Sequence, residues 1–128
     1  MSKIAEFMKR RIVHPQEIEV WYAIPAIRRE IAKEMKKKGL EQREIAKLLG
    51  ITEAAVSYYF GNKRGGEIKF NAKLRKEVEK SVDNILKNNN LIFKEVQRIL
   101  NLPEIREQLC EIHHKCRGVC DDCKLCGE

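Results

Sequence analysis

Two short segments joined by a glycine constrain the fold of this chain more than any other feature. Apolar residues at helical spacing predict a helix over residues 42–49, and Gly50 ends it because glycine tolerates the backbone conformation of a helix C-terminus. Thr52 stands at the position of an N-cap, which predicts a second helix over residues 53–60. A tight turn that contains glycine lets two short helices cross steeply, so this stretch predicts a helix-turn-helix.

The second of these helices is expected to have two different faces. Ile51 and Val56 should fill the space between the two helices, together with one aromatic residue from the end of the second helix. That residue is either Tyr59 or Phe60. With these side chains turned inward, four residues share an outward face: Glu53, Ala54, Ser57 and Tyr58.

Apolar residues at helical spacing also predict helices on both sides of this stretch, so the fold class is expected to be all-α. These helices are 25–38, 72–87 with Asn71 as its N-cap, 91–101, and a last one that begins at Pro103. Pro25 suits a first helical turn, and Ile24 before it is expected in extended geometry. Residues 16–24 fit either a strand or a helix.

Residues 40–65, LEQREIAKLLGITEAAVSYYFGNKRG, resemble the helix-turn-helix of the lambda-repressor-like (Cro/XRE-type) family. The matching positions are Gln42, Ala46, Gly50, Thr52, Val56, Ser57 and the basic residues that follow the second helix. Glu41 departs from the family, which more often has Ser or Thr there, and so does Gly61-Asn62. The whole chain also resembles predicted archaeal regulators that join such a domain to a C-terminal cysteine cluster.

The resemblance implies a five-helix DNA-binding domain over residues 25–101, with an N-terminal arm (1–24) and a C-terminal helix with a Cys-rich tail (102–128). Position by position, it places base contacts at Glu53, Ala54 and Tyr58, with Ser57 nearby and Thr52 as the cap. It places phosphate contacts at Gln42, Arg43, Lys63 and Arg64. The family also implies a homodimer on double-stranded DNA, with half-sites about one helical turn apart. Apolar residues of the fifth and sixth helices and of residues 1–12 are candidates either for the dimer surface or for the core.

The distribution of charge agrees with a polyanionic partner. The net charge is +7, and residues 1–64 carry +6 of it, residues 65–109 carry +2, and residues 110–128 carry −1. No apolar run approaches the ~20 residues of a membrane span. Residues 1–11 lack the apolar core of a secretory signal. We therefore expect a cytoplasmic protein that has no membrane partner.

All five cysteines lie within residues 110–128, which predicts a local site. Four of them, Cys116, Cys120, Cys123 and Cys126, fall within 11 residues, a density typical of iron–sulfur binding runs. Zinc and a metal-free thiol switch are the alternatives. Cys110 is either a fifth ligand or a buried apolar residue. His113 and His114 could replace a thiolate, but we expect both to be solvated at the end of the sixth helix.

These observations predict a sequence-specific transcriptional regulator that senses redox or metal state through its cysteine cluster. The alternative is a metal- or redox-binding protein whose helical domain docks on a protein partner. No Ser/His/Asp arrangement, phosphate-binding loop or suggestive pair of carboxylates is recognisable, so an enzyme is not expected.

Overall fold

The computed structural model describes residues 13–61 and 68–114, and within these ranges every regular element is a helix. The all-α prediction is therefore confirmed for this part of the chain. Lys63, Arg64 and the cysteines from Cys116 onward lie outside the described residues. Within the described ranges, no helix is both long and apolar enough to cross a membrane.

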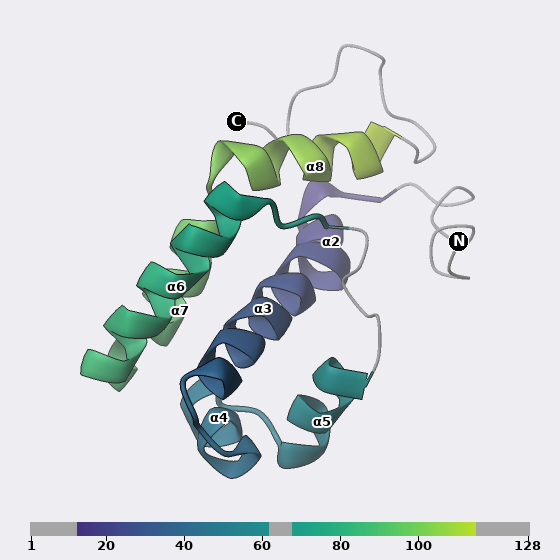
Figure 1. The fold of residues 1–128 in the computed structure, drawn as a ribbon. Helices are drawn as coiled ribbons and strands as arrows, with labels where there is room; N and C mark the ends of the chain where they lie inside the picture. Colours follow the sequence, from purple (N-terminus) through teal and green to yellow (C-terminus); the bar gives the residue numbers. More distant parts are fainter. Residues whose placement is uncertain (1–12, 62–67, 115–128) are drawn as a thin grey trace.

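A continuous helical rod runs through the molecule and is formed by three consecutive elements (Figure 1). They are α2 (Pro15–Ile18), the π-helical turn η1 (Glu19–Ala23) and α3 (Ile24–Lys37). The apolar stripe of α3, with Ile27, Ile31 and Met35 four residues apart, is completely buried. Gly39 follows with a φ of 92°, a left-handed conformation that ends the helix.

The rod decides one alternative that the sequence left open and corrects one prediction. Residues 16–24 are helical, and Ile24, expected in extended geometry, has α-helical φ and ψ of −61° and −47°. The reason is the π-helical turn: the Ile24 N–H bonds to the Glu19 carbonyl, five residues back. A helix widened in this way leaves room for the ring of Pro25, which lacks an N–H and would collide with the preceding turn of a regular α-helix.

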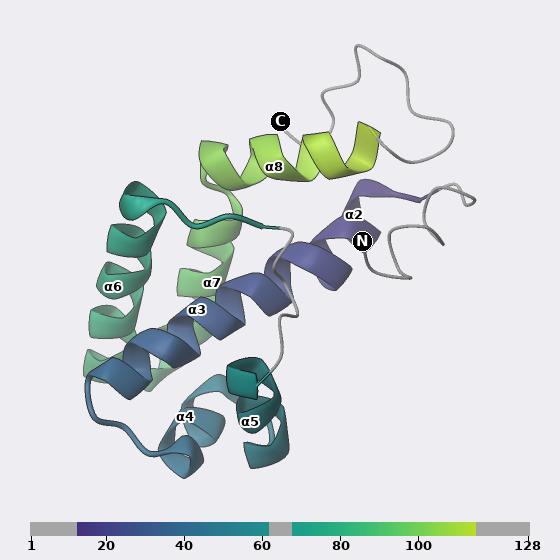
Figure 2. The same ribbon diagram turned by 45° about the vertical axis from the view of Figure 1, so that its right-hand side comes forward.

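The other helices pack around this rod. α4 (Gln42–Leu49) and α5 (Glu53–Gly61) lie at its C-terminal end, and α8 (Pro103–His114) lies at the opposite end (Figure 1). α6 (Ala72–Lys87) and α7 (Ile92–Leu100) run along its side, joined by the short 3-10 turn η2 (Asn89–Leu91) (Figure 2). Asn71 caps α6 as predicted, since its Oδ1 accepts a bond of 2.9 Å from the Leu74 N–H.

One core runs through η1 and all of the α-helices described here. Val13, Ile18 and Tyr22 contribute to it from the expected arm, and Ile105 and Leu109 contribute from α8. The expected boundaries at residues 24/25 and 101/102 therefore do not divide the hydrophobic core.

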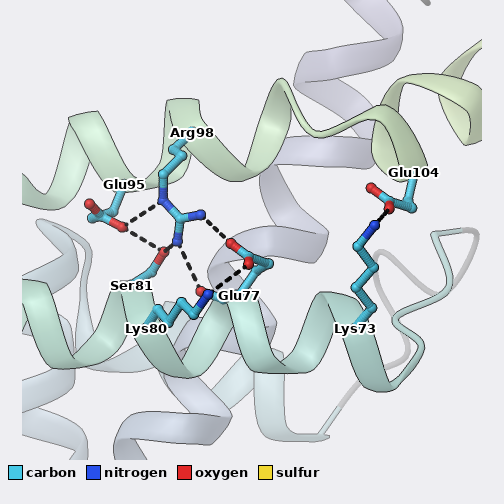
Figure 3. A network of polar contacts seen from close by, with 7 residues as sticks. All are labelled: Lys73, Glu77, Lys80, Ser81, Glu95, Arg98 and Glu104. Atoms are coloured by element: carbon cyan, nitrogen blue, oxygen red, sulfur yellow. Dashed lines mark hydrogen bonds and ion pairs between the residues drawn. The ribbon is translucent and has the colours of Figure 1, made fainter.

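A partly buried polar network joins α6 to α7 (Figure 3). Arg98 is bonded to the carboxylate of Glu77, and its Nη2 donates to the Ser81 hydroxyl at 2.8 Å. Its Nε donates to Glu95 at 3.1 Å, and the Ser81 hydroxyl donates to the same carboxylate at 2.8 Å. Glu95 is only 5% exposed, so these bonds are what make its burial tolerable.

Candidate nucleic-acid interface

The turn between α4 and α5 is shaped by Gly50 and Thr52. Gly50 has a φ of 68°, and a β-carbon at this position would meet nothing within 4 Å. Glycine is therefore favoured here by its backbone conformation, and not by lack of space. The Ile51 N–H bonds to the Ala46 carbonyl at 3.0 Å, and the Thr52 hydroxyl accepts the Ala55 N–H at 3.0 Å. The predicted N-cap of the second helix is confirmed.

α5 turns its apolar residues inward and a row of small and polar residues outward. Val56 is completely buried in the core, Phe60 is partly buried and packs against it, and Tyr59 is 7% exposed. On the opposite side, Glu53, Ala54, Ser57 and Tyr58 are all exposed. We call these four residues the α5 outer face. Their predicted common orientation is confirmed.

A shallow hollow lies beside this face. Its volume is about 360 Å³, and it is lined by Thr52, Ala54, Ala55, Tyr58 and Tyr59. Two alanines, two tyrosines and one threonine thus border this space. Such a surface accepts both apolar groups and hydrogen-bonding groups.

Contacts with α3 fix the inner side of α5. The Lys36 ammonium group lies 4.6 Å from the centre of the Phe60 ring, a cation–π contact between the end of α3 and the end of α5. Both views show α5 at the lower end of the molecule, beside α4 and below the C-terminal half of α3 (Figures 1 and 2). The α5 outer face is therefore presented by a helix fixed on its inner side.

The first turn of α4 carries two predicted phosphate contacts. Gln42 and Arg43 are both exposed there. Glu41 is the N-cap of α4, a position where Ser or Thr is more usual. It is supported by Glu44, whose carboxylate accepts the Glu41 N–H at 3.2 Å. The other two predicted phosphate contacts, Lys63 and Arg64, lie between Gly61 and Ile68, outside the described residues.

The cysteine cluster is described only at its first member. Cys110 lies half-buried on α8 and packs against the core, as a small apolar residue does. Within residues 13–61 and 68–114, no three His, Cys, Asp or Glu side chains are grouped so as to hold a metal ion. Cys116, Cys120, Cys123 and Cys126 are outside the described residues.

His113 corrects the prediction that both histidines are solvated. It is only 5% exposed, and its Nε2 lies 2.6 Å from the Val13 carbonyl oxygen, whereas His114 is exposed. Because a carbonyl only accepts, Nε2 carries the proton in this bond. The Nδ1 atom is buried without a hydrogen-bond partner. His113 therefore joins α8 to the residue that precedes α2 by two positions.

Phe93 belongs to the apolar residues of the fifth predicted helix, which were candidates for either the core or a dimer surface. Its side chain is 81% exposed, so it is not part of the core. The helical spacing indicates this exposure, because Ile92 and Val96 already occupy the inward positions of the helix and Phe93 lies one residue beyond Ile92.

Comparison of the chain with models of protein families, with curated proteins and with solved structures finds no match.

Proposed function

We propose that this protein is a sequence-specific, DNA-binding transcriptional regulator and that α5 is the helix that reads the bases. The observation that carries the proposal is the α5 outer face: four small or polar residues exposed on a short helix whose opposite side is buried. The resemblance of residues 40–65 to lambda-repressor-like helix-turn-helix sequences supports the same reading.

The dimensions and chemistry of α5 suit the major groove. An α-helix with its side chains is about 10–12 Å in diameter, and the major groove, about 12 Å wide, admits one. Glu53 can accept a hydrogen bond from a cytosine amino group, and Ala54 can contact a thymine methyl group. Tyr58, 46% exposed, presents a hydroxyl to a base edge or a phosphate.

Affinity would come mainly from the phosphates. We assign Gln42 and Arg43, at the N-terminus of α4, and Lys63 and Arg64, after α5, to backbone contacts. At the start of α4 the helix dipole and the unpaired N–H groups add to the side chains. The net charge of +7 favours binding to any duplex, so specificity must come from the α5 outer face.

Two groups of substitutions should therefore have different effects. Glu53→Ala and Tyr58→Ala are expected to change which duplex is preferred, because they remove groups that face the bases. Lys63→Ala and Arg64→Ala are expected to weaken binding to all duplexes alike and to lower the salt dependence by roughly one unit of slope each. Selection from random duplexes, followed by titrations at several salt concentrations, measures both effects.

The proposal fails if all four variants bind every duplex like the parent. A simpler first experiment is a gel shift on the DNA upstream of the protein's own gene, with and without excess non-specific competitor. Binding that the competitor abolishes would favour the alternative, in which the helical domain docks on a protein partner.

We further propose that Cys116, Cys120, Cys123 and Cys126 bind an iron–sulfur cluster, or else zinc, and that its state controls DNA affinity. What supports a link is α8, the helix that precedes them. The Gln108 side chain holds the backbone of Lys69 through two bonds of 2.6 and 2.9 Å. The Arg106 side chain pairs with Glu19 at 2.6 Å. α8 thus holds the segments that enter α3 and α6.

Protein purified without oxygen is expected to contain iron and acid-labile sulfide in similar amounts. Replacing Cys120 and Cys123 together by serine should remove them, because thiolates are the ligands of such clusters. Cys110→Ser serves as the matched control, since Cys110 packs against the core. Zinc in place of iron would support the alternative metal, and DNA affinity unchanged in the cluster-free variant would contradict the sensing role.

A further inference from the structure

The first turn of α5 places an acid beside an apolar hollow. Glu53 is exposed, and it takes part in none of the ion pairs found in residues 13–61 and 68–114. The next residue, Ala54, lines the shallow hollow of about 360 Å³, whose lining is mainly apolar. Tyr58 lines the same hollow, and residues four positions apart lie one above the other on a helix. The α5 outer face therefore combines a hydrogen-bond acceptor with a neighbouring apolar recess.

The carboxylate of Glu53 restricts which base can lie against it, because an ionised carboxylate only accepts hydrogen bonds. In the major groove, guanine presents two acceptors, and thymine presents one acceptor and a methyl group. Adenine presents its amino group next to the acceptor N7, whereas cytosine presents its amino group with no acceptor beside it. Each of the other three bases would bring an acceptor toward the carboxylate. Cytosine is therefore the base that Glu53 favours.

The hollow adjoins Glu53 much as C5 of cytosine adjoins the amino group. The amino group is carried by C4, and C4 is bonded to C5, so a substituent on C5 lies directly beside the amino group. Ala54 likewise follows Glu53 directly, with about 3.8 Å between their Cα atoms. A hydrogen atom on C5 would leave the hollow unfilled, whereas a methyl group would contact its lining. Burying that methyl group is favourable because it removes apolar surface from water.

We propose that α5 reads 5-methylcytosine, with the amino group bonded to the Glu53 carboxylate and the methyl group of the same base in the hollow beside Ala54 and Tyr58. This inference rests on the proposed docking of α5 in the major groove. It goes further because it joins both contacts on one base and makes methylation of the DNA a signal that raises affinity. Thymine carries the same methyl group, but its O4 acceptor would face Glu53, so thymine satisfies only the hollow.

Titrations with chemically altered duplexes test the proposal. Selection from random duplexes, made with either cytosine or 5-methylcytosine throughout, first identifies the preferred sequence. Each cytosine of that sequence is then replaced in turn by 5-methylcytosine, thymine or uracil, and binding is measured at constant salt. At the cytosine contacted by Glu53, methylation is expected to raise affinity about fourfold, the effect of burying one methyl group. Thymine at that position should bind about tenfold more weakly than 5-methylcytosine, because the hydrogen bond from the amino group is lost.

Three variants separate the two contacts. Ala54→Val fills the hollow and should abolish the gain from methylation, while cytosine remains preferred over thymine. Ala72→Val is the matched control, because Ala72 is also an exposed alanine in the first turn of a helix, and it should keep the gain in full. Glu53→Gln should lose the preference for 5-methylcytosine over thymine, since an amide can also donate to O4. It should still bind thymine more tightly than uracil, which lacks the methyl group.

The outcomes distinguish this inference from the proposed function. Sequence-specific binding in which no cytosine gains affinity on methylation would overturn the inference and leave the proposed function standing. A gain that Ala54→Val retains would overturn it as well, because another surface would then receive the methyl group. Binding without any sequence preference would refute the proposed function, and the reading of 5-methylcytosine with it.

Discussion

Replacing Ala54 by aspartate is expected to lower the affinity for DNA about a hundredfold or more while the protein stays folded. Ala54 is exposed on the α5 outer face, so the new carboxylate would face the bases and phosphates of a bound duplex. An unpaired like charge forced into an interface costs several kcal/mol, and about 2.7 kcal/mol already corresponds to a hundredfold loss. The helix itself should tolerate the change, because an acid in the first turn interacts favourably with the helix dipole.

Ala72→Asp provides a closely matched control. Ala72 is also an exposed alanine in the first turn of a helix, but it begins α6. The substitution changes the net charge of the protein by the same amount. Equilibrium titrations with a labelled duplex at constant salt, together with thermal melts, compare the two variants. Equal losses of affinity would mean that only overall charge matters, and no loss in Ala54→Asp would remove α5 from the interface.

Arg98→Met is expected to lower the free energy of unfolding by about 3 kcal/mol. The substitution keeps the aliphatic part of the side chain but leaves the buried Glu95 carboxylate without its cation, and such a loss typically costs 3–5 kcal/mol. The low end of this energy range applies because the Arg98 side chain is 35% exposed to water. Denaturant titration at neutral pH measures the change.

Lys80→Met tests the same network from its exposed side. The Lys80 ammonium group lies 3.3 Å from Glu77, but its side chain is 69% exposed. Its loss should cost less than about 1 kcal/mol. Adding Glu95→Gln to Arg98→Met should recover part of the stability, because it removes the stranded charge. If Arg98→Met and Lys80→Met were equally mild, the network between α6 and α7 would contribute little.

The pH dependence of stability provides a further measurement on this network. The bond from Arg98 lowers the pKa of Glu77, despite the opposing effect of partial burial. Burial acts to raise the pKa of Glu95, but the bonds from Ser81 and Arg98 together outweigh it, so that this pKa is also lowered. Both carboxylates therefore stabilise the fold above their unfolded-state pKa of about 4.3, and this contribution is lost as the pH falls below it. The difference between parent and Arg98→Met should shrink at acidic pH.

The central helices were predictable because their signals are local. The predicted range 42–49 agrees with Gln42–Leu49, and 72–87 agrees with Ala72–Lys87. In both cases an apolar stripe lies within the segment, and a residue that ends or caps the helix directly adjoins it. The α5 outer face was predictable for the same reason, since the inward positions of Val56 and Tyr59 determine what points outward.

The sequence was wrong, or left alternatives open, where distant residues decide the outcome. His113 is buried because it meets the Val13 carbonyl, which is 100 positions away in the sequence. The helical state of residues 16–24 depends on a π-helical turn and on packing against α8, and neither has a local signature. The roles of the cysteines after residue 114 rest on their spacing alone.

The continuous helix from Pro15 to Lys37 has a consequence for how this protein can be cut or fused. A fragment that begins at Pro25 would lose Ile18, Tyr22 and Ala23, all of which are in the core. It would also expose the side of α8 that packs on α2 and η1. A portable unit must therefore include at least the core residues from Val13 to Leu109, and a tag or partner domain should not interrupt that span.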